Sequence, residues 1–424
     1  MDTQLHPAEN FTSEVRPLST DWLVSFKDPR QLLQEHPFAL ALEVGSALVL
    51  ALVFRHAKRQ NPQEAYLLLA AMFTTTCFEI LPIIPRPGYM LWWYHQGTVN
   101  LLKHRLPLYV VCCFALVHHL AHCVTSSCDL PRWSRSTATA LIALLLTLPG
   151  LWFSQPLLLS IFHVDDPVFS NRLLGIPFIQ IVVLTLLFFH TSHLFFQNLE
   201  DIPLGDRNLV NMVKCALQTG LVSAIYTIVE QYLLYILFSL TLGAHTGFCA
   251  LALLAILLCI ARKEMQCLQL KSVVFRGFST PFRRPAWWAL VATFAFFVSL
   301  PLWLDTQALK STGERLEIGP CNVRHSVANT SPLEFERRRY ICPEDTAHLA
   351  FDFHCVGTAE LSRAVHKKTS HYSICGKPLT DTARAARATA AYALPCLTVF
   401  YFLMSCSFQF ALQEKKVENC KKWQ

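Results

Sequence analysis

The chain has few charged residues. Asp, Glu, Lys and Arg make up 15% of the 424 residues, whereas a soluble domain carries roughly 25%. Hydrophobic residues make up 53%, and the mean hydropathy is +0.35. A surface this poor in charge excludes a cytosolic enzyme, a disordered scaffold and a nucleic-acid-binding protein. The net charge of +7 is too diffuse to indicate otherwise.

The chain also lacks the short motifs of common catalytic sites. It has no Gly-x-Ser-x-Gly motif, no P-loop, no dinucleotide fingerprint and no His-Glu-x-x-His motif. The first 36 residues lack the basic start and short apolar core of a cleaved signal peptide, so we expect the first helix to be its own insertion signal. No internal repeat of the transporter kind is visible. Membrane location is therefore far better predicted than activity.

Long apolar runs are abundant. A membrane-spanning helix needs about 20 predominantly apolar residues, and nine segments qualify: 37–54, 64–82, 106–124, 136–155, 172–196, 210–241, 244–261, 286–304 and 390–412. The sequence therefore predicts an all-α integral membrane bundle of about nine transmembrane helices with a small disulfide-stapled luminal domain. The expected parts are a luminal tail (1–36), an eight-helix region (37–304), a luminal loop domain (305–389), a ninth helix (390–412) and a cytosolic basic tail (413–424).

Basic residues predict the orientation. With a luminal N-terminus, the cytosolic segments hold sixteen Lys and Arg residues and the short luminal segments hold six. Short cytosolic loops carry the excess of basic residues in membrane proteins, so we expect the N-terminus in the lumen and the C-terminus in the cytosol. Residues 83–105 would reverse this orientation if they crossed the membrane. Their Trp and Tyr residues favour an interfacial or re-entrant luminal element instead.

The predicted luminal loop contains four cysteines: Cys321, Cys342, Cys355 and Cys375. An even number in an oxidising compartment predicts two disulfides, with three pairings possible. The spacing has no Cys-x-x-Cys pair, which disfavours a zinc site.

Two glycosylation tripeptides support the predicted orientation, and a di-lysine tail predicts residence in the endoplasmic reticulum. Asn10 and Asn329 begin N-glycosylation tripeptides, and both fall on the predicted luminal side. Lys421 and Lys422 lie fourth and third from the C-terminus, as in the di-lysine retrieval signal that coat proteins recognise. The alternative is a basic tail that anchors the last helix by snorkelling.

Histidines gather in two helices. His118, His119 and His122 lie near the end of the third predicted helix, and His190 and His193 lie near the end of the fifth. Residues three or four apart share a helix face, so we expect His118 and His122, with His190 or His193, to hold Zn²⁺ or Fe²⁺ with one position open. His119 points about 100° away from His118 and is expected to be a bystander. The alternative is a set of neutral interfacial histidines.

Carboxylates inside the predicted helices form the second candidate set: Glu43, Glu79 and Glu230. A carboxylate in hydrocarbon costs several kcal/mol unless it is neutral or paired, so each is a candidate for function. We expect Glu79 to contact His95, and we place Glu79, His95 and Glu230 as candidate catalytic residues. The alternative is that each ties helices together by hydrogen bonds.

Several motifs resemble those of an uncharacterised family of animal multi-pass membrane proteins: Cys77-Phe78-Glu79, Trp92-Trp93-Tyr94-His95-Gln96, Leu106-Pro107-Leu108-Tyr109, Tyr340-Ile341-Cys342-Pro343, Phe351-Asp352-Phe353-His354-Cys355 and Tyr372-Ser373-Ile374-Cys375-Gly376. The resemblance spans most of the chain and implies no activity.

Three functions stay open. A metal-dependent lipid-modifying enzyme of the endoplasmic reticulum, with membrane lipid as its partner, would use the histidines. A transporter or channel would use the three carboxylates. A structural or trafficking membrane protein would need neither set.

Overall fold

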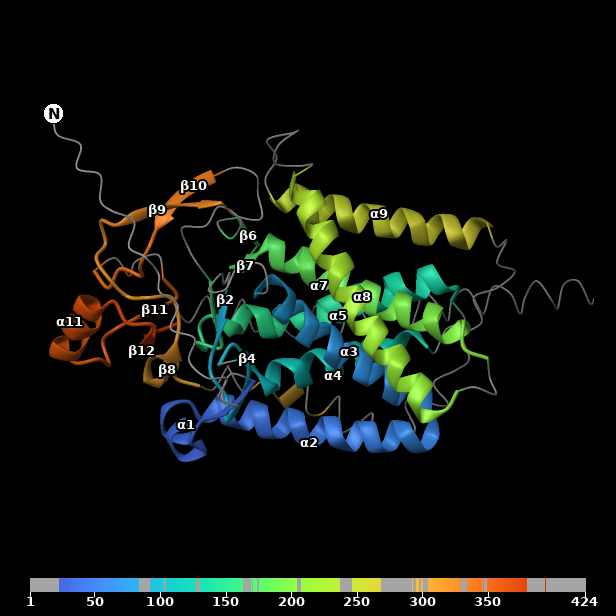
Figure 1. Cartoon of the computed structure of the whole chain (residues 1–424), viewed down its shortest axis with the longest axis horizontal. Helices are drawn as coiled ribbons and strands as arrows, with labels where there is room; N and C mark the ends of the chain where they lie inside the picture. The colour runs from blue at the N-terminus through green and yellow to red at the C-terminus, as the bar shows by residue number, and fades with distance from the viewer. Residues whose placement is uncertain are drawn as a thin grey trace, which may run out of the picture.

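The computed structural model describes residues 23–83, 92–162, 169–236, 246–267 and 304–379, apart from gaps at 103, 127–129, 170, 174, 204–206, 329–333, 345 and 347–348, together with residues 292, 295, 296, 299 and 393. Long helices run side by side and a smaller unit covers one end of them (Figure 1). The long helices are α2 (Pro37–Gln60), α3 (Pro62–Ile80), α4 (Leu108–Thr125), α5 (Arg132–Ser154), α7 (Phe178–Glu200), α8 (Leu209–Ile236) and α9 (Thr246–Cys267).

Five helices in the described part are long and apolar enough to cross a membrane: Pro37–Arg59, Leu108–Thr125, Arg132–Ser154, Phe178–Glu200 and Leu209–Leu234. Helix α3 is not among them, because two glutamates and three successive threonines lower its mean hydropathy. Helix α9 contains a shorter apolar stretch, Leu251–Ile260. The predicted spans 286–304 and 390–412 fall almost entirely outside the described residues, as do Asn10, Asn329, Lys421 and Lys422.

Proline and asparagine set the helix starts. Pro37 and Pro62 occupy the first turns of α2 and α3, where a missing N–H costs nothing. Asn61 caps α3 by accepting a hydrogen bond from the Gln63 backbone N–H at 3.3 Å. Asn61 alone separates the two helices, and α3 packs back against α2.

Small and polar residues bring helices α3, α7 and α8 together. A Cβ added to Gly220 of α8 would lie 2.5 Å from the Cβ of Phe73 on α3, so only glycine allows this approach. Thr191 of α7 donates a hydrogen bond to Thr74 of α3 at 3.1 Å. The interior of the bundle is therefore joined by hydrogen bonds as well as by apolar packing.

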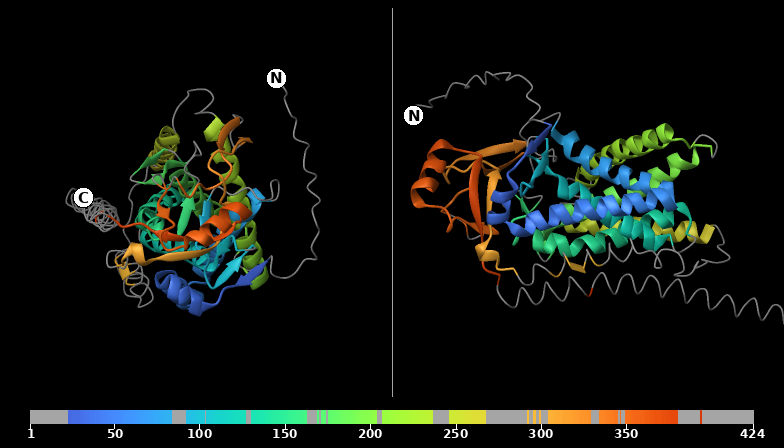
Figure 2. Two further views of the ribbon diagram at one scale, coloured as in Figure 1. Left: turned by 90° about the vertical axis from the view of Figure 1, so that its left-hand side faces the viewer. Right: turned by 90° about the horizontal axis from the view of Figure 1, so that it is seen from below.

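Residues 304–379 form the unit at the end of the bundle, called here the cap domain (Figure 2). Its main sheet has the order β11 (Phe351–Asp352), β12 (His371–Gly376), β8 (Lys310–Glu314), and all pairs are antiparallel. A second pair joins β9 (Arg324–Ala328) to β10 (Glu334–Arg338), and helix α11 spans Thr358–Lys367. Disulfides join Cys321 to Cys342 and Cys355 to Cys375. This confirms the prediction of two disulfides and identifies one of the three pairings that the sequence left open.

The cap domain shares its core with the bundle. Ile374 and Phe351 of the sheet belong to the same buried cluster as Phe38 of α2 and Ile161. The segment predicted to be interfacial contributes two short strands in its described part, β2 (Trp92–Tyr94) and β3 (Val99–Leu101). Strand β2 pairs with β5 (Ser160–Phe162), and β3 pairs with both β1 (Val24–Phe26) and β4 (Leu106–Pro107). Strand β6 (Arg172–Leu173) pairs with β7 (Ile176–Pro177). Helix α1 (Pro29–Glu35) lies beside β8.

Two buried histidines lie at this junction, with ring centroids 4.5 Å apart. Nδ1 of His36 accepts a hydrogen bond from the Ala39 N–H, so Nε2 carries the proton and donates to the Leu157 carbonyl at 2.6 Å. Nδ1 of His95 lies 2.5 Å from Oγ of Ser311 on β8. Burial lowers the pKa of His36 to about 4, and burial together with the neighbouring His36 ring lowers the pKa of His95 well below its usual range.

We predict that Cys355→Ser lowers the free energy of unfolding of the cap domain by about 3 kcal/mol, because the cross-link restricts the unfolded chain. Thermal unfolding of the full chain in detergent measures the change. The control is Cys259→Ser, which alters an exposed cysteine of α9 outside both disulfides and is expected to have little effect. Peptide mapping that finds two of the four cap cysteines as free thiols in the native protein would contradict the assignment.

We predict that the protein loses stability as the pH falls from 6.5 towards 4. In this window the unfolded chain protonates His36 while the folded chain keeps it neutral, so protons favour the unfolded state by roughly 3 kcal/mol at the acid end. His36→Asn keeps a helix-capping side chain without a titrating ring and is expected to flatten this dependence. Unfolding midpoints at pH 7 and pH 5 measure it. The control is His366→Asn, which alters an exposed residue of α11 and is expected to keep the wild-type pH dependence. Equal pH dependence of the unfolding midpoint in wild type and His36→Asn would refute the assignment.

Candidate metal-binding site

Five buried histidines lie in the halves of α4 and α7 that point away from the cap domain: His118, His119, His122, His190 and His193. Both helices begin at the cap and run in the same direction (Figure 1). The two clusters therefore lie at the same depth, as the sequence indicates.

The α4 histidines predicted to bind metal face α7. Nε2 of His118 lies 2.8 Å from Oγ of Ser192, and the ring of His122 lies 5.3 Å from that of Phe196 between centroids. Ser192 and Phe196 therefore face these rings where the predicted site requires an imidazole of α7.

The α7 histidines face other helices. Nε2 of His190 lies 2.9 Å from Oε2 of Glu230 on α8. The ring of His193 lies 4.1 Å from that of Trp133 on α5. The described residues contain two groups of three candidate ligands with atoms within 4.8 Å of one another, and neither includes any of the four predicted ligands.

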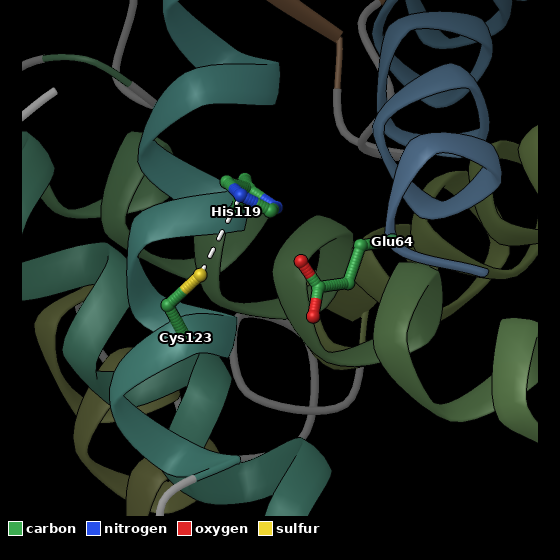
Figure 3. A group of neighbouring side chains, drawn as sticks. All are labelled: Glu64, His119 and Cys123. Carbon is green, nitrogen blue, oxygen red and sulfur yellow. Dashed lines mark hydrogen bonds between the residues drawn. The ribbon is translucent and has the colours of Figure 1, made fainter. Parts of the chain in front are cut away.

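One of these groups consists of Glu64, His119 and Cys123 (Figure 3). His119 and Cys123 are one turn apart on α4, with Nε2 and Sγ 3.5 Å apart, and both are buried. Glu64 lies in the first turn of α3 and faces them from across the gap between the two helices. Asn61 Nδ2 donates to the Glu64 carboxylate at 3.2 Å and helps to orient it.

A polar pocket of about 330 Å³ adjoins this group. Glu64 belongs to both the group and the pocket wall. The remaining polar lining comes from the start of α3, the end of α4 and the start of α5: Asn61, Gln63, His122, Ser126 and Arg135. Water-sized molecules in the pocket can therefore reach the Glu64 carboxylate.

The second group is unsuitable for metal. It consists of Asp352, His354 and Cys375, but the sulfur of Cys375 is bonded to Cys355 and is no thiolate ligand. Asp352 instead accepts hydrogen bonds from the backbone and ring of His354.

Glu79 and His95, expected to meet, have different partners. Glu79 accepts hydrogen bonds from Trp92 Nε1 at 3.3 Å and from the Tyr94 hydroxyl at 3.0 Å. Successive residues of a strand point to opposite faces, so Trp92 and Tyr94, two residues apart on β2, face Glu79 together. His95 directs its Nδ1 towards Ser311 in the cap domain.

The other two carboxylates also have separate partners. Glu43 accepts hydrogen bonds from the backbone N–H groups of Thr98 at 2.5 Å and Val99 at 2.9 Å, and so holds the loop before β3. Glu230 pairs with His190 in the other half of the bundle. Each carboxylate joins two parts of the structure, which agrees with the alternative interpretation from the sequence.

Sequence reasoning missed Glu64 and dismissed His119. An acidic residue in the first turn of a helix is common, because it complements the helix dipole, so Glu64 gave no distinct signal. The available signal was geometric: α3 begins, and α4 ends, at the same end of an antiparallel pair.

The chain belongs to a family described as a domain of unknown function (DUF7802), whose model matches residues 11–406. No curated protein and no solved structure gives a significant match. The family match includes both the helices and the cap domain, which is consistent with their common core.

Proposed function

We propose that this protein is a metal-dependent enzyme of the endoplasmic reticulum membrane that modifies a membrane lipid. The observation that carries the proposal is the group Glu64, His119 and Cys123, whose ligand atoms lie within 4.8 Å of one another beside a polar pocket. This group replaces the histidine set expected from the sequence.

The donor set suits zinc. Carboxylate, imidazole and thiolate are the ligands that Zn²⁺ accepts, and three protein ligands leave a fourth position open. A thiolate is less suited to non-haem Fe²⁺, whose common site has two histidines and one carboxylate. Bound zinc would supply an activated water at neutral pH.

The surroundings favour a lipid substrate. The polar pocket lies at the ends of helices that are long and apolar enough to cross a membrane, at the depth where a lipid headgroup meets the bundle. Arg135 in the pocket wall offers a cation for an anionic headgroup. His122 in the same wall offers an imidazole that can hydrogen-bond to a headgroup.

The proposed topology has the cap domain in the lumen and the polar pocket at the cytosolic end. Two disulfides in the cap domain support an oxidising compartment for it. The end of the bundle away from the cap domain carries basic residues at its helix ends: Arg59, Arg132 and Arg207. This agrees with the excess of basic residues predicted for the cytosolic side. Retrieval by coat proteins through Lys421 and Lys422 completes the proposal.

We predict that the purified full-length protein contains close to one zinc per chain. His119→Ala and Cys123→Ala are each expected to reduce the zinc content to background, because two ligands hold the ion poorly. Elemental analysis of detergent-purified protein measures the content, and thermal unfolding confirms that the variants are folded.

The matched control is His118→Ala, the neighbouring residue, whose ring faces Ser192. It is expected to retain zinc. Zinc that persists in His119→Ala, or that disappears in His118→Ala alone, would refute the site.

We predict that glycans attach to Asn10 and stay in the form sensitive to endoglycosidase H. Replacing Lys421 and Lys422 by serine should release the protein and make these glycans resistant, which a mobility shift on gels measures. Cytosolic accessibility of an N-terminal tag in selectively permeabilised cells would overturn the topology. Unchanged glycans in the double variant would favour a basic anchoring tail.

A further inference from the structure

A second cavity lies between α4, α5 and α7, with a volume of about 280 Å³. Most of its wall is hydrocarbon. Phe114, Leu120, Leu146 and Phe188 are buried and line its interior. The polar pocket shares none of its lining residues with this cavity.

The cavity is elongated. It follows α4 from Tyr109 to Leu120, which is about 16 Å along a helix. This length accommodates an extended hydrocarbon chain.

Helix α5 supplies the opening. Pro149 lies inside this helix and removes one backbone hydrogen bond. A Cβ placed on the exposed neighbour Gly150 meets nothing within 4 Å. Both residues line the cavity, together with the half-buried Val117 and Leu151, so the cavity opens to the side of the helices.

Polar side chains gather at the end of the cavity near the cap domain. Ser154, Ser160 and Tyr94 line this end, and Gln180 joins them from the first turn of α7. The opposite end, near Val117 and Leu120, is apolar. A molecule with one polar end and one hydrocarbon chain matches this distribution.

We infer that this cavity binds one acyl chain of a membrane lipid, with the polar end beside Ser154 and Ser160 and the methyl end beside Leu120. Apolar cavities of this size exclude water and take up apolar ligands, and the lipid around a membrane helix supplies such chains through a lateral opening. The site goes beyond the proposed function, because it needs neither metal nor catalysis.

The test uses full-length protein in liposomes of phosphatidylcholine that carries a photoreactive diazirine on one acyl chain. A diazirine near the methyl end is expected to label peptides containing Val117 and Leu146. A diazirine near the carbonyl is expected to label peptides containing Ser154 and Ser160. Labelling spread equally over the outward faces of α2 and α8 would overturn the site.

Gly150→Phe fills the opening and is expected to reduce this labelling about tenfold. The substitution suits a helix better than glycine does, and no atom obstructs its Cβ. Gly150→Ala keeps the cavity open, and Leu48→Phe alters an exposed residue of α2, so both are expected to label within twofold of wild type. Thermal unfolding confirms that each variant is folded.

Val117→Phe, from the opposite wall, must reproduce the loss. Undiminished labelling in folded Gly150→Phe and Val117→Phe would refute the inference. His119→Ala distinguishes this site from the metal site. The inference requires that the His119→Ala protein, even when it contains no zinc, is labelled by the acyl-chain diazirine as the wild type is.

Discussion

Polar side chains within the apolar bundle must find partners inside the protein, because the lipid around the bundle offers none. Several hydroxyl groups, such as that of Thr185, donate to a carbonyl of their own helix, whereas other polar groups join neighbouring helices. His118 meets Ser192 between α4 and α7, and His190 meets Glu230 between α7 and α8. Thr125 of α4 lies 2.9 Å from Thr139 of α5. Apolar packing alone tolerates rotation of a helix, whereas these pairs fix one orientation.

The same constraint explains which features could be predicted from the sequence. Helix positions follow from long apolar runs, and seven of the nine predicted segments correspond to helices in the described part of the chain. The four cap cysteines were also predicted to pair. The short strands were not predicted: β2 and β5 have three residues each, too few for a period-two pattern to distinguish them from loops.

The site was harder to predict because it depends on the rotation of each helix. A sequence shows that His118 and His122 share a face, but it does not show which helix that face meets. The expected metal site therefore required two conditions: histidine clusters at equal depth, and helix rotations that turn both clusters towards each other. The sequence indicates only the first. Glu79 and His95 illustrate the same limit, since the one-residue alternation of β2 decides which side chains Glu79 meets.

Three successive residues of α4 summarise this geometry. Each step along a helix turns the side chain by about 100°. Val117 therefore lines the apolar cavity, His118 bonds to α7, and His119 joins Glu64 of α3. At one level of the bundle, α4 therefore lines the cavity, bonds to α7 and contributes to the candidate metal site. Because the faces are separate, a substitution on one face leaves the residues of the other two in contact with their own partners.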